Sequence, residues 1–172
     1  MLLAEKKKAE NISEYIIYMY QTELLIRNFE LDLEKIKLHV IGNIPEGKTD
    51  KAALTDWYEQ VIADMNSEEL QTQGHLSYVQ QEVDTLSALS LQLLAENEDY
   101  QQIFNAARPS IRALIMASEG QVTNPVQACL NGIFGFLLAR MNNNPIDTEQ
   151  QEWAEHFGNA LSYLSHYYKQ KG

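Results

Sequence analysis

Apolar residues recur at intervals of three and four along almost the whole chain, and this periodicity limits the possible folds more than any other feature of the sequence. Such spacing puts apolar side chains on one face of an α-helix, whereas a strand would alternate at every second residue. Only 4 prolines and 8 glycines interrupt the pattern in 172 residues. No segment has the pattern of a strand. We therefore expect an all-α fold, an irregular bundle of about six or seven helices.

Glycines, prolines and capping residues divide the chain into the expected helices. These helices cover residues 3–28, 30–40, 50–66 with a short continuation toward 73, 76–93, 100–118, 125–141 and 147 onward. The apolar pattern continues in phase through Pro109, which predicts one kinked helix there rather than a break. In the last helix we expect Gln151 to complete a capping box.

The segment 124–142 is the most apolar part of the chain. Its strongly polar residues between positions 126 and 141 are Gln127, Asn131 and Arg140. A helix that is apolar on nearly all sides is expected to be buried by its neighbours, so we place this one at the centre of the bundle. Four small residues share one stripe along it: Ala128, Gly132, Gly135 and Ala139. We expect Trp153 and Phe157 of the last helix to pack closely against this stripe.

The negative charge is concentrated in the middle of the chain. Residues 52–107 carry no lysine or arginine but ten carboxylates, whereas the flanking segments are nearly balanced, and the net charge is −11. Nucleic-acid binding requires clustered basic residues, so this distribution argues against it. An acidic helix face usually serves solubility, and the alternative is a docking site for a basic partner or divalent cations.

The length and the remaining composition favour a single domain that spans residues 1–172 and is located in the cytoplasm. The single cysteine, Cys129, excludes an internal disulfide and lies in an apolar run, so we interpret it as a core residue. The amino terminus lacks the apolar stretch of a signal peptide. The longest apolar run, residues 133–139, is too short to cross a membrane.

No motif in the sequence predicts catalysis, a metal or a cofactor. The four histidines are His39, His75, His156 and His166, and none belongs to the Glu-x-x-His pairs of a di-iron bundle. Nucleotide-binding, nucleophile-elbow and calcium-loop motifs do not occur. His75 stands out because it follows Gly74 at a helix start, where an imidazole could line a cleft or simply be hydrogen-bonded at a junction.

Tyrosines are concentrated in the two terminal helices. Six of the nine lie there: Tyr15, Tyr18, Tyr20, Tyr163, Tyr167 and Tyr168. Core packing with internal hydrogen bonds is one interpretation. The other is an inter-helix pocket lined by Tyr, Met and Phe that binds a small amphipathic molecule. The candidate ligand-binding residues for that pocket are His75, Tyr15, Tyr18 and Tyr163.

A resemblance to a known family is carried by residues 3–12, 14–20, 74–76, 137–140 and 164–168, and it extends over nearly the whole chain. In these segments the chain resembles an uncharacterised family of cytoplasmic proteins from Bacteroidetes, a domain of unknown function. It implies an all-helical bacterial protein and transfers no activity or site residue.

Amphipathic helices without a reactive cluster lead to a hypothesis of function. We expect a non-catalytic protein that acts through helix faces, either in self-association as a homo-oligomer or with a protein partner. The alternative is small-molecule binding in the inter-helix pocket. An enzyme with a novel site is a third hypothesis, and it would need two titratable residues that meet in a cleft.

Overall fold

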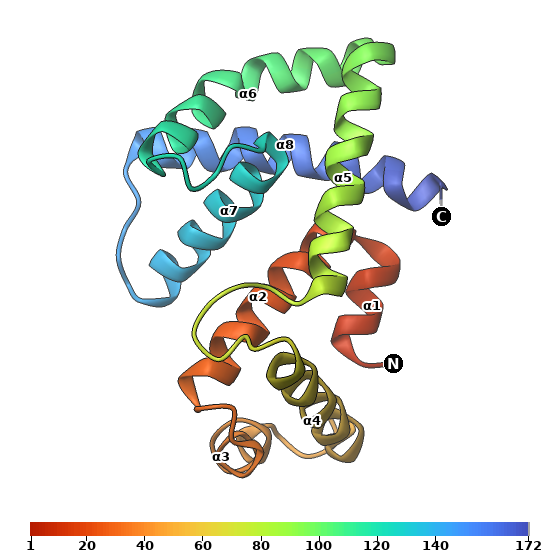
Figure 1. The fold of residues 1–172 in the computed structure, drawn as a ribbon, viewed down its shortest axis with the longest axis vertical. Coiled ribbons are helices and arrows are strands. Elements are labelled where there is room, and N and C mark those ends of the chain that lie inside the picture. Colours follow the sequence, from red (N-terminus) through yellow and green to blue (C-terminus); the bar gives the residue numbers. More distant parts are fainter. Residues whose placement is uncertain (172) are drawn as a thin grey trace.

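The computed structural model describes residues 1–171, which form helices joined by short connections (Figure 1). The helices are α1 (Leu3–Glu10), α2 (Ile12–Asn28), α3 (Leu33–His39), α4 (Lys51–Ser67), α5 (Ser77–Glu96), α6 (Glu98–Ala117), α7 (Pro125–Met141) and α8 (Thr148–Lys171), with a 3-10 turn, η1 (Ile41–Asn43), after α3. This part of the chain contains no strand, which confirms the predicted all-α class.

Two local differences separate the observed helices from the predicted ones, and the first of them adds a helix. The expected helix 3–28 breaks at Asn11, whose backbone is extended (φ −155°) and whose side chain accepts a hydrogen bond from the Glu14 backbone N–H. An asparagine in this position satisfies a free amide at the start of α2. The expected helical continuation toward residue 73 is absent, because the chain turns at Glu69 with φ +58°.

Other predicted boundaries are confirmed. Asp50 and Asn124 cap α4 and α7 through their side chains, and α6 continues through Pro109 as one helix. The predicted role of Gln151 at the start of α8 is wrong. The capping pair is formed by Asp147 and Gln150, and each side chain accepts a hydrogen bond from the backbone N–H of the other residue.

Glu69 occupies a left-handed conformation that suits glycine. It follows α4 in a motif closed by the hydrogen bond from Leu70 N–H to the Met65 carbonyl at 2.9 Å. We expect Glu69→Gly to raise the free energy of unfolding by about 1 kcal/mol, because glycine adopts this conformation without steric strain. Urea denaturation followed by circular dichroism measures the change. Asn143→Gly is the matched control, since Asn143 has φ +57° at the end of α7 and asparagine tolerates this region. A destabilised Glu69→Gly chain would contradict the prediction.

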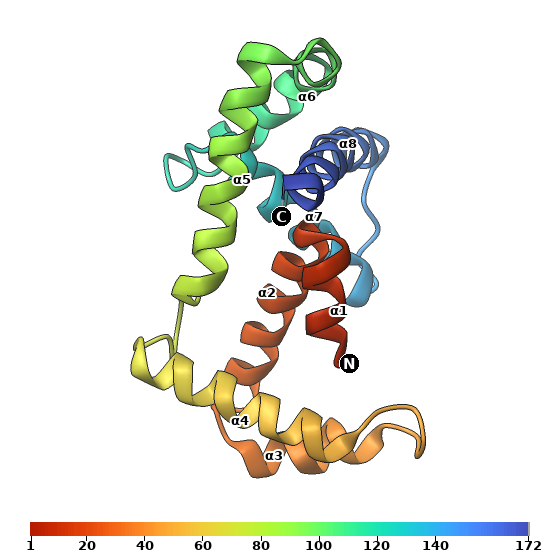
Figure 2. The same cartoon turned by 90° about the vertical axis from the view of Figure 1, so that its right-hand side faces the viewer.

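The helices form an upper group and a projecting arm. In Figures 1 and 2, α5 to α8 lie in the upper part and α3 and α4 project at the lower end, with α2 running between the two. The backbone of α8 packs most extensively on α6 and α7, whereas α4 approaches mainly α3 and η1. We call residues 33–67, which contain α3, η1 and α4, the α3–α4 arm.

The apolar helix α7 is buried only in its first half. Residues of that half, including Leu130 and Gly132, are buried, but from Ile133 to Met141 every residue is half-buried or exposed. The prediction of a fully interior helix is therefore wrong for the second half. The reason is that α8 crosses α7 and diverges from it toward their connecting loop, as Figure 1 shows.

The crossing point confirms the predicted contact between a glycine and an aromatic ring. A Cβ atom added to Gly132 would lie 2.5 Å from Cε2 of Phe157, so α8 approaches α7 as closely as a glycine permits. A Cβ atom added to Gly135 would meet nothing within 4 Å. The small-residue stripe is thus covered by α8 at Gly132 and uncovered at Gly135.

Candidate functional site: a groove between α2 and α7

An apolar groove runs along the uncovered half of α7. It consists of two depressions of about 410 Å³ and 340 Å³ that share Tyr18 and Gln21. Helix α2 supplies the largest share of the lining. Helix α7 contributes Ile133, Leu137, Leu138 and Met141, and α8 contributes Gly158, Leu161 and Ser162 at the smaller depression. We call this surface the α2–α7 groove.

The groove is elongated because α2 and α7 run in the same direction. Ile17 and Ile133 line the smaller depression, whereas Leu25 and Met141 line the larger one, further along both helices. On α2, the lining residues Glu14, Tyr18, Gln21, Leu25 and Asn28 follow one another at intervals of three and four. Such spacing keeps them on a single face.

The α3–α4 arm closes the larger end of the groove. Tyr58 of α4 lines the larger depression, and Trp57 packs on Tyr18 with ring centroids 6.0 Å apart. Burial raises the pKa of both Tyr18 and Tyr58, the latter to about 12. Both tyrosines therefore stay neutral at physiological pH and present uncharged rings to the groove. A third depression of about 750 Å³ adjoins the groove at Tyr18 and Tyr58, beside the start of α1.

The groove has the chemistry of a binding surface. Its charged lining residues are Lys7 and Glu14, which pair with each other at 3.6 Å at one end. The Thr22 hydroxyl donates to the Tyr18 carbonyl, and the Gln21 amide lies 3.9 Å from the sulfur of Met141. The lining contains no cysteine or histidine that could act as nucleophile or base.

A buried carboxylate lies behind the groove, on another face of α2. The side chain of Glu23 is 0% exposed, and its two oxygens lie 2.8 Å from Nδ1 of His75 and 2.8 Å from the Leu76 backbone N–H, which donates to it. Tyr20 stacks on the His75 ring with centroids 4.0 Å apart. Glu23 thus binds both the imidazole and the start of α5.

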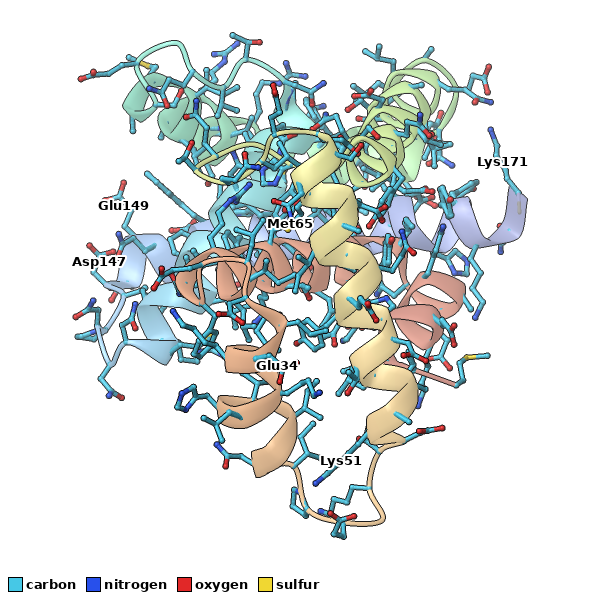
Figure 3. The ribbon with its side chains drawn as sticks, turned by 60° about the horizontal axis from the view of Figure 1, so that its bottom comes forward. Glu34, Lys51, Met65, Asp147, Glu149 and Lys171 are labelled. Carbon is cyan, nitrogen blue, oxygen red and sulfur yellow. The ribbon has the colours of Figure 1, made fainter. Side chains whose placement is uncertain are left out.

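Arg27, one turn further along α2, binds the same connection between α4 and α5. Its Nε donates to the Leu70 carbonyl at 3.0 Å and its Nη2 to the Gly74 carbonyl at 2.5 Å. Figure 3 shows this part of the molecule from the side of α3 and α4, with Met65 near the end of α4 that leads into the connection.

The predicted ligand-binding residues lie in different places. Tyr18 lines the groove. His75 is hydrogen-bonded to Glu23, and Tyr15 is buried below the ammonium of Lys8, 5.5 Å from its ring. The Tyr163 hydroxyl donates to Oδ1 of Asn97, which caps α6. The structure brings Tyr18 alone of these four to the groove.

Sequence reasoning missed the two features that define this region. Glu23 lies on the same face of α2 as the buried residues Met19 and Ile26. A carboxylate within this apolar stripe could have indicated a buried, hydrogen-bonded glutamate. For the groove, the signal was that α7 is apolar on more sides than one crossing helix can cover.

The described residues contain neither a metal-binding cluster nor an ionised thiol. They contain no group of three His, Cys, Asp or Glu side chains that could hold a metal ion. Cys129 is buried, and burial raises the pKa of its thiol to about 12, so it is protonated at neutral pH. No helix within residues 1–171 has both the length and the apolar character needed to cross a membrane.

Comparison with known proteins identifies the family. No match is found among curated proteins or among solved structures. The model of a domain of unknown function, DUF4924, matches residues 1–172. The chain therefore belongs to the DUF4924 family, a domain of unknown function.

Proposed function

We propose that this chain is a non-catalytic interaction protein that binds an amphipathic helix of a partner protein in the α2–α7 groove. The observation that carries the proposal is the uncovered second half of α7, where Ile133, Leu137 and Leu138 line a groove instead of a core. Binding sites are typically concave and lined mostly by apolar side chains, as this groove is.

The shape of the groove favours a helix as the occupant. Its lining on α2 extends from Ser13 to Asn28, which at 1.5 Å per residue is a length of about 22 Å. A helix of about four turns has this length and would lay one apolar face between the two lining helices. The polar residues at its edges, Gln21 and Asn28, could bond to the polar face of such a helix.

A small amphipathic ligand is the second candidate, and the volume of the larger depression favours it. About 410 Å³ is within the range of sites that bind small molecules. Tyr18, Tyr58 and Gln21 offer rings and polar atoms on its walls. Binding of a small ligand would occupy the Tyr58 end and leave the Ile133 end free.

Site-specific crosslinking tests which occupant binds. We would place a photo-crosslinking residue at Leu138 in the groove and, as a control, at Leu91, which is 71% exposed on α5. We expect position 138 alone to capture a partner protein in cells, at a segment with an amphipathic helical pattern. A synthetic peptide of that segment should bind at least about tenfold more weakly to Leu138→Asp than to Leu91→Asp, because the new carboxylate would be buried in the interface.

Three results would contradict this proposal. Capture of a second copy of the chain would show self-association, and capture of a small molecule would favour the second candidate. Equal capture at positions 138 and 91 would show that the groove is not a specific site.

A further inference from the structure

We infer that Glu23 and Arg27 form a clasp that holds the α3–α4 arm at a fixed angle and thereby sets the width of the α2–α7 groove. This inference concerns the regulation of the proposed binding site, and only its consequence for binding rests on the proposed function. The geometry of the clasp and the hinge stands on its own contacts.

The arm joins the rest of the chain through two connections that can act as hinges. The first contains Glu30 and Leu31, with φ angles of +59° and +57°, and the second contains Glu69 and Gly74, with φ angles of +58° and +95°. Hinge residues are typically a few such positions at the ends of helices. Figure 2 shows the arm projecting below α5 from the lower end of α2.

The clasp binds the second connection at three backbone positions. Arg27 donates to the carbonyls of Leu70 and Gly74, and Glu23 accepts the N–H of Leu76. Because Glu23 and Arg27 are four residues apart on α2, they act from neighbouring positions on its surface. The charged clasp bonds are stronger than neutral ones and hold the connection that follows α4 against α2.

A short series of contacts links the clasp to α7. His75 bonds to Glu23 and stacks on Tyr20, whose hydroxyl accepts a hydrogen bond from Gln127 of α7 at 2.9 Å. The Tyr20 ring also contacts Phe134 of α7 edge-on, with centroids 5.7 Å apart. The clasp therefore connects the arm with the helix that forms the opposite wall of the groove.

Movement of the arm would change the groove directly. Tyr58 on the arm lines the same depression as Leu138 and Met141 of α7. If the clasp opens, the arm can swing away and separate these walls. A partner that binds only the closed groove would stabilise the clasp, and by reciprocity the intact clasp would strengthen binding.

Distances between spin labels test the hinge without any partner. Labels at Gln60→Cys on α4 and Asn142→Cys after α7 lie at exposed positions on the two sides of the groove, and the buried native Cys129 should remain unlabelled. We expect a single narrow distance distribution in the otherwise unchanged chain. Glu23→Ala and Arg27→Met should each broaden it by about twofold and shift it to longer distances.

Matched controls make the result specific. Arg112→Met removes an exposed arginine on α6 and should leave the distribution unchanged. Circular dichroism must show full helix content in each variant, and if Glu23→Ala does not fold, Arg27→Met decides. An unchanged distribution in Arg27→Met would overturn the clasp. Because this measurement involves no partner, it is independent of whether the crosslinking experiment finds one.

Discussion

Gly132→Ala is expected to lower the free energy of unfolding by about 2 kcal/mol, although alanine is the better helix former. The new methyl group would lie 2.5 Å from Cε2 and 2.6 Å from Cδ2 of Phe157, and 3.0 Å from Leu114. Phe157 is fully buried and also stacks on Phe136, so its ring has little room to move. The strain therefore has to be taken up by a shift of α8 against α7.

Gly135→Ala in the same helix is the control. A methyl group at Gly135 meets nothing within 4 Å, so the substitution should raise the free energy of unfolding by up to about 1 kcal/mol through helix propensity alone. Urea denaturation of both variants gives the difference, which we expect to be about 3 kcal/mol. Equal effects would mean that the close approach of α7 and α8 does not limit the residue at position 132.

Glu23→Ala is expected to lower the free energy of unfolding by about 3 kcal/mol. The substitution removes the acceptor of the Leu76 N–H, which is buried at the start of α5, and it also leaves a cavity. His75 loses its partner too, but its ring is 34% exposed and can bond to water. The larger part of the effect should therefore come from Leu76.

Two further variants separate the contributions at Glu23. Glu23→Gln keeps an acceptor for Leu76 and should cost about 1 kcal/mol, whereas Glu14→Ala at an exposed position of α2 should change stability by less than about 0.5 kcal/mol. Thermal and urea unfolding measure all three. If Glu23→Ala were as mild as Glu14→Ala, the buried carboxylate would have no structural role.

The interaction proposal places function on a surface that the fold leaves open. A helix of α7's composition would be fully buried in most bundles, and here α8 covers it at Gly132 but not at Gly135. The groove and the clasp are both on α2, on different faces. Helix α2 therefore connects the binding surface with the element that could control it.

Much of the candidate site could not be predicted because it depends on residues distant in sequence. Tyr18 was proposed from the tyrosine content of the terminal helices, and it does line the groove. Its partners Tyr58 and Leu138 are far away in the chain, and no local pattern pairs them. Glu23 meets His75 across 52 positions, so sequence spacing alone gave no indication of the contact.

The sequence by itself determined the all-helical class and most helix boundaries, because periodicity, caps such as Asp50 and Asn124, and the N1 proline of α7 act within a few residues. Only the tertiary structure decided which half of α7 is covered. That outcome depends on the angle at which α8 crosses α7. The contact of Phe157 with Gly132 allows this angle, and the residues from Ile133 to Met141 are therefore left half-buried or exposed. A helical pattern records how apolar a surface is, whereas the packing of distant helices decides whether that surface becomes core or groove.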